Sequence, residues 1–316
     1  MDFVHKPVLL EETLNYWASQ PHGIYIDGTV GGGGHSAALL QQLPQAQLIG
    51  IDQDDEALAA AENKLMPFGS RVRLVKENFA HIAQVAAMLA LPEIDGILLD
   101  IGVSSYQLDC SERGFSYMQD APLDMRMDRH GSGPTAAHLV NTLTEEELAN
   151  IIYQYGEERY SRRIARQIVA ARQEKPITTT GELTALIKKA MPTVAKREEQ
   201  HPAKRTFQAL RIAVNQELSV LEKGLTSALE ILRPGGRLCV ITFHSLEDRI
   251  VKETFRTWAK GCICPPDLPV CQCGKSPSVR LLTRKPITAT EKELQENPRS
   301  RSAKLRAVEK VTGLKF

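Results

Sequence analysis

Three short apolar runs in the first hundred residues each end in an aspartate, and this pattern restricts the fold more than any other feature of the chain. Counting one further run, four strands are predicted, at Ile24–Asp27, Leu48–Asp52, Val72–Lys76 and Ile94–Asp100. The segments between them have the spacing of amphipathic helices, at Ser36–Gln42, Glu56–Leu65 and Ile82–Leu89. Strands that alternate with helices form parallel sheets, whose carboxyl edges bind ligands. The chain therefore predicts an α/β fold with Asp27, Asp52 and Asp100 along one sheet edge.

The first run leads into a glycine-rich loop, Asp27-Gly28-Thr29-Val30-Gly31-Gly32-Gly33-Gly34-His35. Glycines let the backbone approach a ligand closely, and the helix expected near Ser36 would present free amides. The loop lacks the dinucleotide fingerprint, because Ser36 stands where the last glycine would fall, and no Gly-Lys-Ser/Thr of a P-loop follows. Each element alone is compatible with ordinary turn and capping chemistry. Together they predict a nucleoside ligand without a pyrophosphate, with Asp52 holding the ribose hydroxyls.

The pattern changes after Asp100, where a polar stretch runs to Pro134 and no strand is predicted before Pro202. Successive helices are predicted instead, at Thr144–Tyr153, Glu158–Gln173 and Thr180–Met191, with start signals at Thr144, Thr180 and Gly181. This segment predicts an all-helical insertion.

The sheet is expected to resume after the insertion. A long helix over 203–232 leads through Arg233-Pro-Gly-Gly236 into a buried strand at Arg237–Phe243, and Val279–Thr283 is a further strand candidate. Glu291–Arg306 is predicted to be a polar, basic tail that packs only in part.

A formal net charge of +1 conceals a strong asymmetry between the two halves. Residues 1–155 carry 8 Lys and Arg against 21 Asp and Glu, whereas residues 156–316 carry 31 against 17. This favours an acidic catalytic half joined to a basic half that meets nucleic acid, although solvated helix faces of opposite sign are the alternative. No apolar run approaches a membrane span and no secretory signal is recognisable, so a cytoplasmic protein without a membrane contact is expected.

Six segments spread over nearly the whole chain carry a resemblance to a known family, and they are His5–Glu12, Asp27–His35, Asp100–Ser105, Arg113–Ser116, Pro122–Asp128 and Thr242–Asp248. With them the chain resembles the bacterial RsmH (MraW) family. These enzymes use S-adenosylmethionine to methylate the exocyclic N(4) amino group of a cytidine in the decoding region of 16S rRNA, in the small ribosomal subunit. The resemblance implies a Rossmann-like class I S-adenosylmethionine-dependent methyltransferase with an inserted all-helical substrate-recognition domain.

The resemblance and the helix pattern divide the chain into three parts. Residues 1–105 form the first part of the methyltransferase domain, 106–205 the inserted helical domain, and 206–316 the second part, with a Cys-rich loop and a basic tail. Within the insertion, basic residues that could track RNA phosphates recur at helical spacing, at Arg159, Arg162, Arg163 and Arg166, and Lys204 and Arg205 extend this surface. The alternative is a solvated basic face.

The resemblance also implies seven contacts to the methyl donor, which are Gly33, Gly34, His35, Asp52, Phe79, Asp100 and Gln107. The loop amides suit the methionine carboxylate, and Phe79 offers an apolar face to adenine. Asp100 would hold the methionine ammonium or lie beside the incoming amine. Taken alone, His35 would be a helix-start or surface residue.

The expected chemistry follows from the weak nucleophilicity of a cytosine amino group, whose lone pair is delocalised into the ring. Positioning should dominate, and acceptors aimed at the amino hydrogens would stabilise the developing charge and then receive a proton. The catalytic candidates, in order, are Asp100, Ser104, Ser105 and His244. For His244 a structural bond to Glu247 or Asp248 is an equal alternative. No metal is required for the transfer.

Four cysteines crowd into one short segment, as Cys262-Ile-Cys264 and Cys271-Gln-Cys273 around a Pro-rich loop. Four thiols in this arrangement could converge on a structural zinc. Since C-x-C pairs are less diagnostic than C-x-x-C pairs, reduced or redox-active thiols are the alternative.

Two other functions compete with the methylation of ribosomal RNA. An amino-methyltransferase acting on DNA would carry Asp/Ser/Asn-Pro-Pro-Tyr/Phe/Trp, where this chain has Asp100-Ile-Gly-Val. The other alternative is a ribosome-assembly factor that binds the donor without transferring methyl, and the presence of both the glycine loop and the Asp100–Ser105 segment argues against it.

Overall fold

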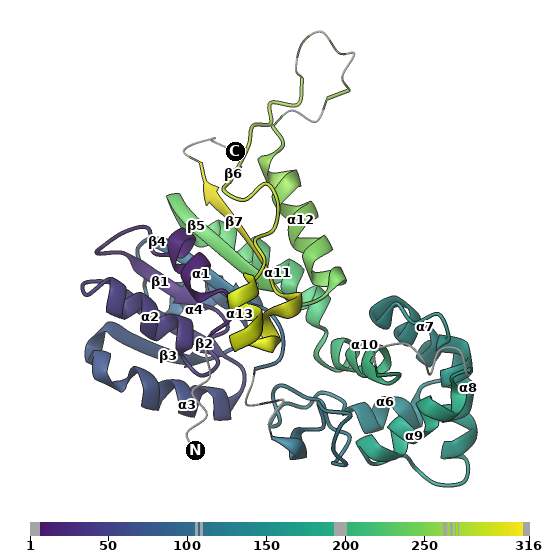
Figure 1. Ribbon diagram of the computed structural model, residues 1–316. Helices are drawn as coiled ribbons and strands as arrows, with labels where there is room; N and C mark the ends of the chain where they lie inside the picture. The colour runs from purple at the N-terminus through teal and green to yellow at the C-terminus, as the bar shows by residue number, and fades with distance from the viewer. Residues whose placement is uncertain are drawn as a thin grey trace. The chain divides into compact units, whose positions relative to one another are not determined.

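The computed structural model describes residues 7–104, 107, 110–192, 201–261, 264–265, 268, 270 and 272–311. The chain divides into two compact units, of which the first combines Met1–Gly102 with Leu218–Phe316 and the second is Val103–Glu217 (Figure 1). The second unit extends in both directions beyond the range 106–205 expected from the sequence. Within the described residues, no helix is both long and apolar enough to cross a membrane.

A seven-stranded sheet forms the centre of the first unit, with the strand order β3-β2-β1-β4-β5-β7-β6. Its strands are β1 (Ile24–Asp27), β2 (Gln47–Asp52), β3 (Val72–Lys76), β4 (Ile94–Asp100), β5 (Leu232–Thr242), β6 (Val279–Leu281) and β7 (Lys304–Lys310). Strands β1 to β5 are parallel, whereas β7 pairs antiparallel with both β5 and β6. All six predicted strands are confirmed, with small shifts at some ends, and the sheet confirms the Rossmann-like α/β class.

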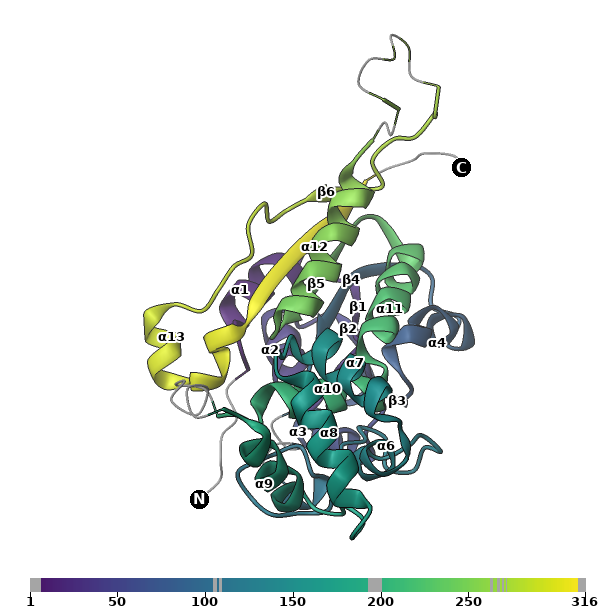
Figure 2. The same ribbon diagram turned by 90° about the vertical axis from the view of Figure 1, so that its right-hand side faces the viewer.

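Helices cover both faces of this sheet. One face packs against α1 (Leu10–Trp17), α2 (Gly34–Gln42) and α3 (Asp55–Leu65). The other face packs against α4 (Ile82–Met88), α11 (Glu217–Ile231) and α12 (Ser245–Ala259). Figure 2 shows α1 and α2 on one side of the strands and α4 and α11 on the other. Alternate strand residues serve the two layers, since Leu98 belongs to the first core and Leu99 to the second.

The segment predicted as a partly packed tail, Glu291–Arg306, is ordered instead, and that prediction is wrong. It forms α13 (Glu291–Glu296), the 3-10 helix η5 (Pro298–Ser302) and the start of β7. Leu305 and Ala307 are fully buried between the layers. Arg306 is buried as well, because its Nε donates to Oδ1 of Asp248 at 2.6 Å. A basic residue that reads as solvent-exposed in the sequence is therefore paired inside the fold.

The single long helix predicted over 203–232 is also wrong, because two helices occupy this range. The first is α10 (Lys204–Asn215), and α11 follows it. Between them Gln216 adopts a left-handed conformation with φ of +51°, which ends α10. Glutamine is a good helix former, so the sequence gives no sign of this break.

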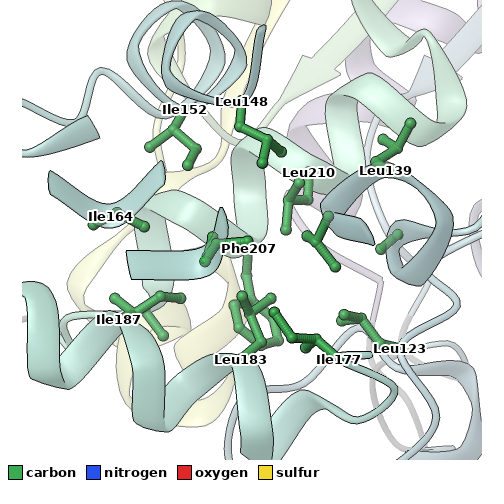
Figure 3. Close-up of a cluster of buried hydrophobic side chains, with 14 of the residues drawn as sticks. Leu123, Leu139, Leu148, Ile152, Ile164, Ile177, Leu183, Ile187, Phe207 and Leu210 are labelled. Atoms are coloured by element: carbon green, nitrogen blue, oxygen red, sulfur yellow. The ribbon is translucent and has the colours of Figure 1, made fainter. Parts of the chain in front are cut away.

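The second unit is built from helices around its own apolar core. They are α6 (Ala136–Thr142), α7 (Glu145–Gly156), α8 (Ser161–Arg172), α9 (Thr180–Ala190) and α10, preceded by the 3-10 helix η3 (Ser111–Arg113). Figure 3 shows the core residues that these helices and the preceding segment supply, among them Leu148, Leu183 and Phe207. Thr144 closes a capping box with Glu147, as its predicted place at a helix start requires, whereas the cap of α9 is Thr179 rather than Thr180.

Two of the family segments, 113–116 and 122–128, contact each other closely through backbone atoms within this unit. The side chain of Arg113 is 1% exposed, and its Nη2 donates to the carbonyl oxygen of Met127 at 2.9 Å. Gly114 has a φ of +73°, and a Cβ atom there would collide with the carbonyl oxygen of Pro122. The segments 113–116 and 122–128 therefore have a structural reason for their residues, independent of any ligand.

Candidate functional site

The glycine loop between β1 and α2 presents backbone rather than side chains. Gly31 and Gly33 have φ values of +50° and +75°, and Gly33 is the N-cap of α2. At Gly34 a Cβ atom would lie 2.5 Å from Cγ of Pro7. The left-handed conformation disfavours other residues at Gly33, and the proline leaves no room for a side chain at Gly34. The loop thus brings the first amides of α2 to the carboxyl edge of the sheet.

Two of the strand-end aspartates stabilise this loop and the turn after β2. Asp27 is 2% exposed and accepts a hydrogen bond from the Ser36 hydroxyl at 2.6 Å. Asp52 accepts the N–H of Gly31 at 2.9 Å and that of Asp54 at 3.0 Å. Burial raises the pKa of both carboxyls to about 6. Both aspartates end their strands at the edge where the sequence predicts them.

Asp100, at the end of β4, lies in the most unusual electrostatic environment of the site. Its Oδ1 is buried and has no hydrogen-bond partner among the described residues. Its Oδ2 lies 3.7 Å from Nδ1 of His35. Burial raises the pKa of Asp100 to about 8, and the negative charges of Asp27 and Glu247 add to this effect. A carboxyl group with a raised pKa and an unpartnered oxygen is typical of a functional position.

His35 is buried, contrary to what the residue alone would suggest. It lies in the first turn of α2 with 7% of its surface exposed, and its Nε2 is 2.9 Å from the carbonyl oxygen of Val8. The N-terminal segment is fixed in turn, because the N–H of Leu9 donates to Oε1 of Glu293 at 2.8 Å. Residues 7–9 therefore pack against the start of α2 beside the glycine loop, an arrangement that the sequence does not reveal.

Phe79 lies in the 3-10 helix η2 (Phe79–His81), directly after β3. Its ring packs on Gly224 in the interior of α11, where a Cβ atom would lie 2.6 Å from Cε2 of the ring. The Cβ of Phe79 also lies close to Gly28, where an added Cβ atom would be 3.3 Å from it. The family resemblance implies Phe79 as a donor contact. Gly224 is not among the predicted residues, although an isolated glycine inside a helical pattern is a usable signal.

His244 follows β5 and is the N-cap of α12. Its Nε2 lies 2.8 Å from Oε1 of Glu247, and the N–H of Glu247 points back to the ring in a capping box. The other oxygen of Glu247 accepts the N–H groups of Phe243 and His244 at 2.9 and 3.2 Å. Of the two carboxylates that were structural alternatives, His244 contacts Glu247, whereas Asp248 pairs with Arg306.

Ser104 and Gln107 belong to the second unit and bond each other. The N–H of Ser104 donates to Oε1 of Gln107 at 3.0 Å, and the N–H of Gln107 donates to Oγ of Ser104 at 3.2 Å. Gln107 is 4% exposed. Ser105 lies outside the described residues.

The predicted RNA-contacting arginines lie on or beside α8, and we call Arg159, Arg162, Arg163 and Arg166 the α8 basic face. All four are exposed. Acidic side chains from α7 partly neutralise it, since Nε of Arg166 lies 3.5 Å from Glu145 and Arg162 shares a shallow pocket with Glu145 and Glu146. Lys204 and Arg205 begin α10, and Arg205 lies 3.9 Å from the buried Glu158.

The cysteine segment is described only in part. Cys264 and Cys273 are partly exposed, and the N–H of Gln272 donates to Sγ of Cys264 at 3.4 Å. Cys262 and Cys271 lie outside the described residues. The four-cysteine zinc site therefore stays a prediction.

Comparison with known proteins gives consistent matches over nearly the whole chain. The model of the MraW methylase family matches residues 2–311. The chain is 61% identical to a ribosomal RNA small subunit methyltransferase H of Symbiobacterium thermophilum, over 98% of each chain. It is 58% identical to the protein of the same name from Heliobacterium modesticaldum, over 98% of this chain and all of the relative. A solved methyltransferase homolog protein from Pyrococcus horikoshii is 14% identical, with a TM-score of 0.43 over 97% of this chain and 67% of that one.

Proposed function

Because the chain belongs to the MraW methylase family, we propose that it transfers a methyl group from S-adenosylmethionine to the RNA of the small ribosomal subunit. The relatives that cover its whole length carry the name ribosomal RNA small subunit methyltransferase H. We further propose that the target is the N(4) amino group of a cytidine in the decoding region of 16S rRNA, modified in the cytoplasm. This finer assignment rests on the six family segments from His5–Glu12 to Thr242–Asp248.

The observation that carries donor binding is the convergence of a side-chain-free loop and three strand-end carboxyls in the first unit. The amides at Gly33 and Gly34 suit the methionine carboxylate, because a helix N-terminus favours an anion. Asp52 suits the ribose, since each of its oxygens keeps lone-pair capacity beyond the backbone bonds described above. Asp100 offers an unpartnered buried oxygen to the positive part of the donor. Phe79, His35 and the Gln107 amide complete the proposed contacts.

When bound, the donor supplies an electrophilic methyl group on a positively charged sulfur. The amino nitrogen of cytosine uses its lone pair to form the new bond to carbon, the sulfur keeps the electron pair of the broken bond, and the nitrogen then loses a proton. We propose Asp100 as the group that receives this proton. Its raised pKa, about 8, makes its carboxylate a stronger base than an ordinary aspartate. Ser104 and Ser105 remain candidates for accepting hydrogen bonds from the amino group.

For His244 the contacts favour a positioning role. Nδ1 accepts the backbone N–H of Glu247 at 3.5 Å, and Nε2 lies 2.8 Å from Oε1 of Glu247 without a hydrogen bond among the described residues. These contacts place the ring at the first turn of α12. We propose that the α8 basic face, together with Lys204 and Arg205, contacts RNA phosphates, which would fix the register of the substrate without reading its bases.

One labelling experiment tests the proposal. The purified chain is incubated with methyl-labelled S-adenosylmethionine and, separately, with assembled small subunits, free ribosomal RNA or DNA, and the labelled nucleoside is identified. N(4)-methylcytidine in ribosomal RNA is the expected product. Label only in DNA would favour the DNA amino-methyltransferase, and donor binding without any transfer would favour the assembly factor. Asp100→Asn should lose transfer while binding of the donor is partly kept, and wild-type turnover by that variant would exclude Asp100 as the proton acceptor.

A further inference from the structure

We propose that His35 and Asp100 hold one proton between them in the donor-free protein, and that binding of the positively charged donor expels this proton into solvent. The inference rests on the proposed function, because it requires the donor to bind beside Asp100. It assigns a role to the side chain of His35 beyond the donor contact that the resemblance implies for this residue.

The hydrogen bond of His35 to the N-terminal segment determines which ring nitrogen carries hydrogen. Nε2 lies 2.9 Å from the carbonyl oxygen of Val8, and since a carbonyl oxygen only accepts, Nε2 must be the protonated nitrogen. In a neutral ring Nδ1 then holds a lone pair. This lone pair is 3.7 Å from Oδ2 of Asp100. A lone pair and an ionised carboxylate repel each other, so a proton on either of the two groups is favoured.

Contacts of Pro7 and Leu9 fix the position of the Val8 carbonyl, and the tautomer of His35 is therefore fixed as well. Leu9 adopts a left-handed conformation with φ of +52°, and its N–H is bound by Glu293 of α13. Pro7 lies against Gly34, the first residue of α2. The carbonyl between Pro7 and Leu9 therefore cannot readily turn away from His35.

The groups around Asp100 add negative charge rather than remove it. Asp27 on β1 and Glu247 on α12 both disfavour its ionisation, and His35 on α2 faces it from the third side. Among the ion pairs of the described residues, no lysine or arginine pairs with Asp100. Only 26% of the Asp100 side chain is exposed, so water compensates its charge poorly. A proton is the compensating charge that the donor-free site holds, and a cationic donor would take its place.

The exchange has a consequence for the order of events in catalysis. Methyl transfer to a neutral amino group produces a neutral thioether, a neutral N-methylated amino group and one free proton. If donor binding has already expelled a proton, the amine proton passes to the vacant Asp100 carboxylate and stays in the site. Departure of the uncharged thioether product then restores the starting state. The one proton that the reaction must release therefore leaves when the donor binds, and not during the chemical step.

Isothermal titration calorimetry of the full chain at pH 7 tests the proposal. S-adenosylmethionine is titrated in PIPES and in Tris, whose ionisation enthalpies differ, and the difference between the observed enthalpies gives the protons released per donor bound. For a group with a pKa of about 8, the wild type should release about 0.9 proton. S-adenosylhomocysteine lacks the sulfonium charge and should release clearly less.

Three variants separate the contributions. Asp100→Asn should abolish the release, and His22→Gln, at an exposed histidine outside the site, should leave it unchanged. His35→Gln keeps a donor for the Val8 carbonyl but has no titrating nitrogen, so the pH at which release falls to half should move downward. If Asp100→Asn no longer binds the donor, the wild type still tests the proton exchange, because its proton release can be compared between S-adenosylmethionine and S-adenosylhomocysteine.

The outcomes distinguish this inference from the proposed function. Failure of the wild type to bind either ligand would overturn the proposed function itself. Binding with equal enthalpies in the two buffers would overturn only the proton exchange. Equal release with both ligands would remove the sulfonium charge as its cause, and an unchanged midpoint in His35→Gln would remove His35 from the pair.

Discussion

The ring of Phe79 packs against Gly224 so closely that a Cβ atom on the glycine would lie 2.6 Å from Cε2 of the ring. Gly224 lies inside the 15-residue helix α11, where glycine is about 1 kcal/mol less favourable than alanine. The close approach of the ring accounts for a glycine at this unfavourable position. Gly224 thus sets where the proposed adenine-binding ring can lie.

Gly224→Ala should consequently weaken donor binding through Phe79. We expect the dissociation constant for S-adenosylmethionine to rise about tenfold, and the free energy of unfolding in urea to fall by ~1–3 kcal/mol because overpacking outweighs the gain in helix propensity. Lys223→Ala, exposed on the same helix, is the control. In a Phe79→Leu background the effect of Gly224→Ala on binding should nearly vanish, and an effect of full size there would show that Gly224 does not act through the ring.

The three strand-end aspartates predict how stability depends on pH. Their folded-state pKa values, about 6 for Asp27 and Asp52 and about 8 for Asp100, exceed the ordinary value of 3.8. At these three groups the folded state therefore binds more protons than the unfolded state between about pH 4 and 8. Their contribution to the free energy of unfolding should fall as the pH rises, by up to about 1.4 kcal/mol per pH unit for each group in its range.

Comparison with Asp100→Asn isolates one of these contributions. Carboxyls whose pKa is lowered, such as Asp248 beside Arg306, act oppositely but equally in both proteins. The variant should gain stability relative to the wild type as the pH rises from 5 to about 8, measured by urea unfolding at each pH. Parallel curves for the two proteins would contradict the raised pKa of Asp100.

The contact between His244 and Glu247 predicts that His244 is replaceable by another capping residue. Asparagine is a good N-cap, so His244→Asn should keep kcat within about tenfold, whereas loss of a general base typically lowers kcat by about 10²–10⁴. Glu247→Ala should lower the free energy of unfolding by ~1–3 kcal/mol, because two backbone N–H groups lose their acceptor. A fall in kcat beyond a hundredfold in a stably folded His244→Asn would restore the catalytic interpretation.

The α8 basic face predicts unequal effects of two neighbouring arginines on RNA binding. Arg163 is exposed, whereas Arg166 lies 3.5 Å from Glu145. Arg163→Ala should reduce the slope of log affinity against log salt concentration by about 1, as expected for one lost phosphate contact. Arg166→Ala should reduce it less. Lys64→Ala, on an exposed face of α3, should leave the slope unchanged, and equal slopes for Arg163→Ala and wild type would remove Arg163 from the interface.

Much of the sheet could be predicted because its signals are local. Each of the first four strands is a short, mostly apolar run, and the aspartates that end β1, β2 and β4 follow directly from the sequence. The glycine loop is equally explicit, since left-handed backbone at Gly33 leaves a trace in residue type. Periodicity and turn chemistry were sufficient for these elements.

Features that depend on distant partners could not be predicted. The strand β7 reads as a basic tail, because the burial of Arg306 depends on Asp248, which lies 58 residues earlier in the chain. The tautomer of His35 depends on its hydrogen bond to the backbone carbonyl of Val8, and no residue type in the sequence indicates this bond. In both cases the decisive interaction joins segments that are remote in sequence, so local patterns carry no information about it.

The position of β7 also constrains how the protein can be made. Residues 304–310 insert between β5 and β6, so during synthesis β5 keeps an open edge until these residues have emerged. The second unit, continuous from Val103 to Glu217, contains all of its own core residues and can close earlier. Folding on the ribosome should therefore finish the inserted unit first and the surrounding sheet last. A nascent chain interrupted before residue 304 would expose the apolar edge of β5, a template for aggregation that quality-control factors would recognise.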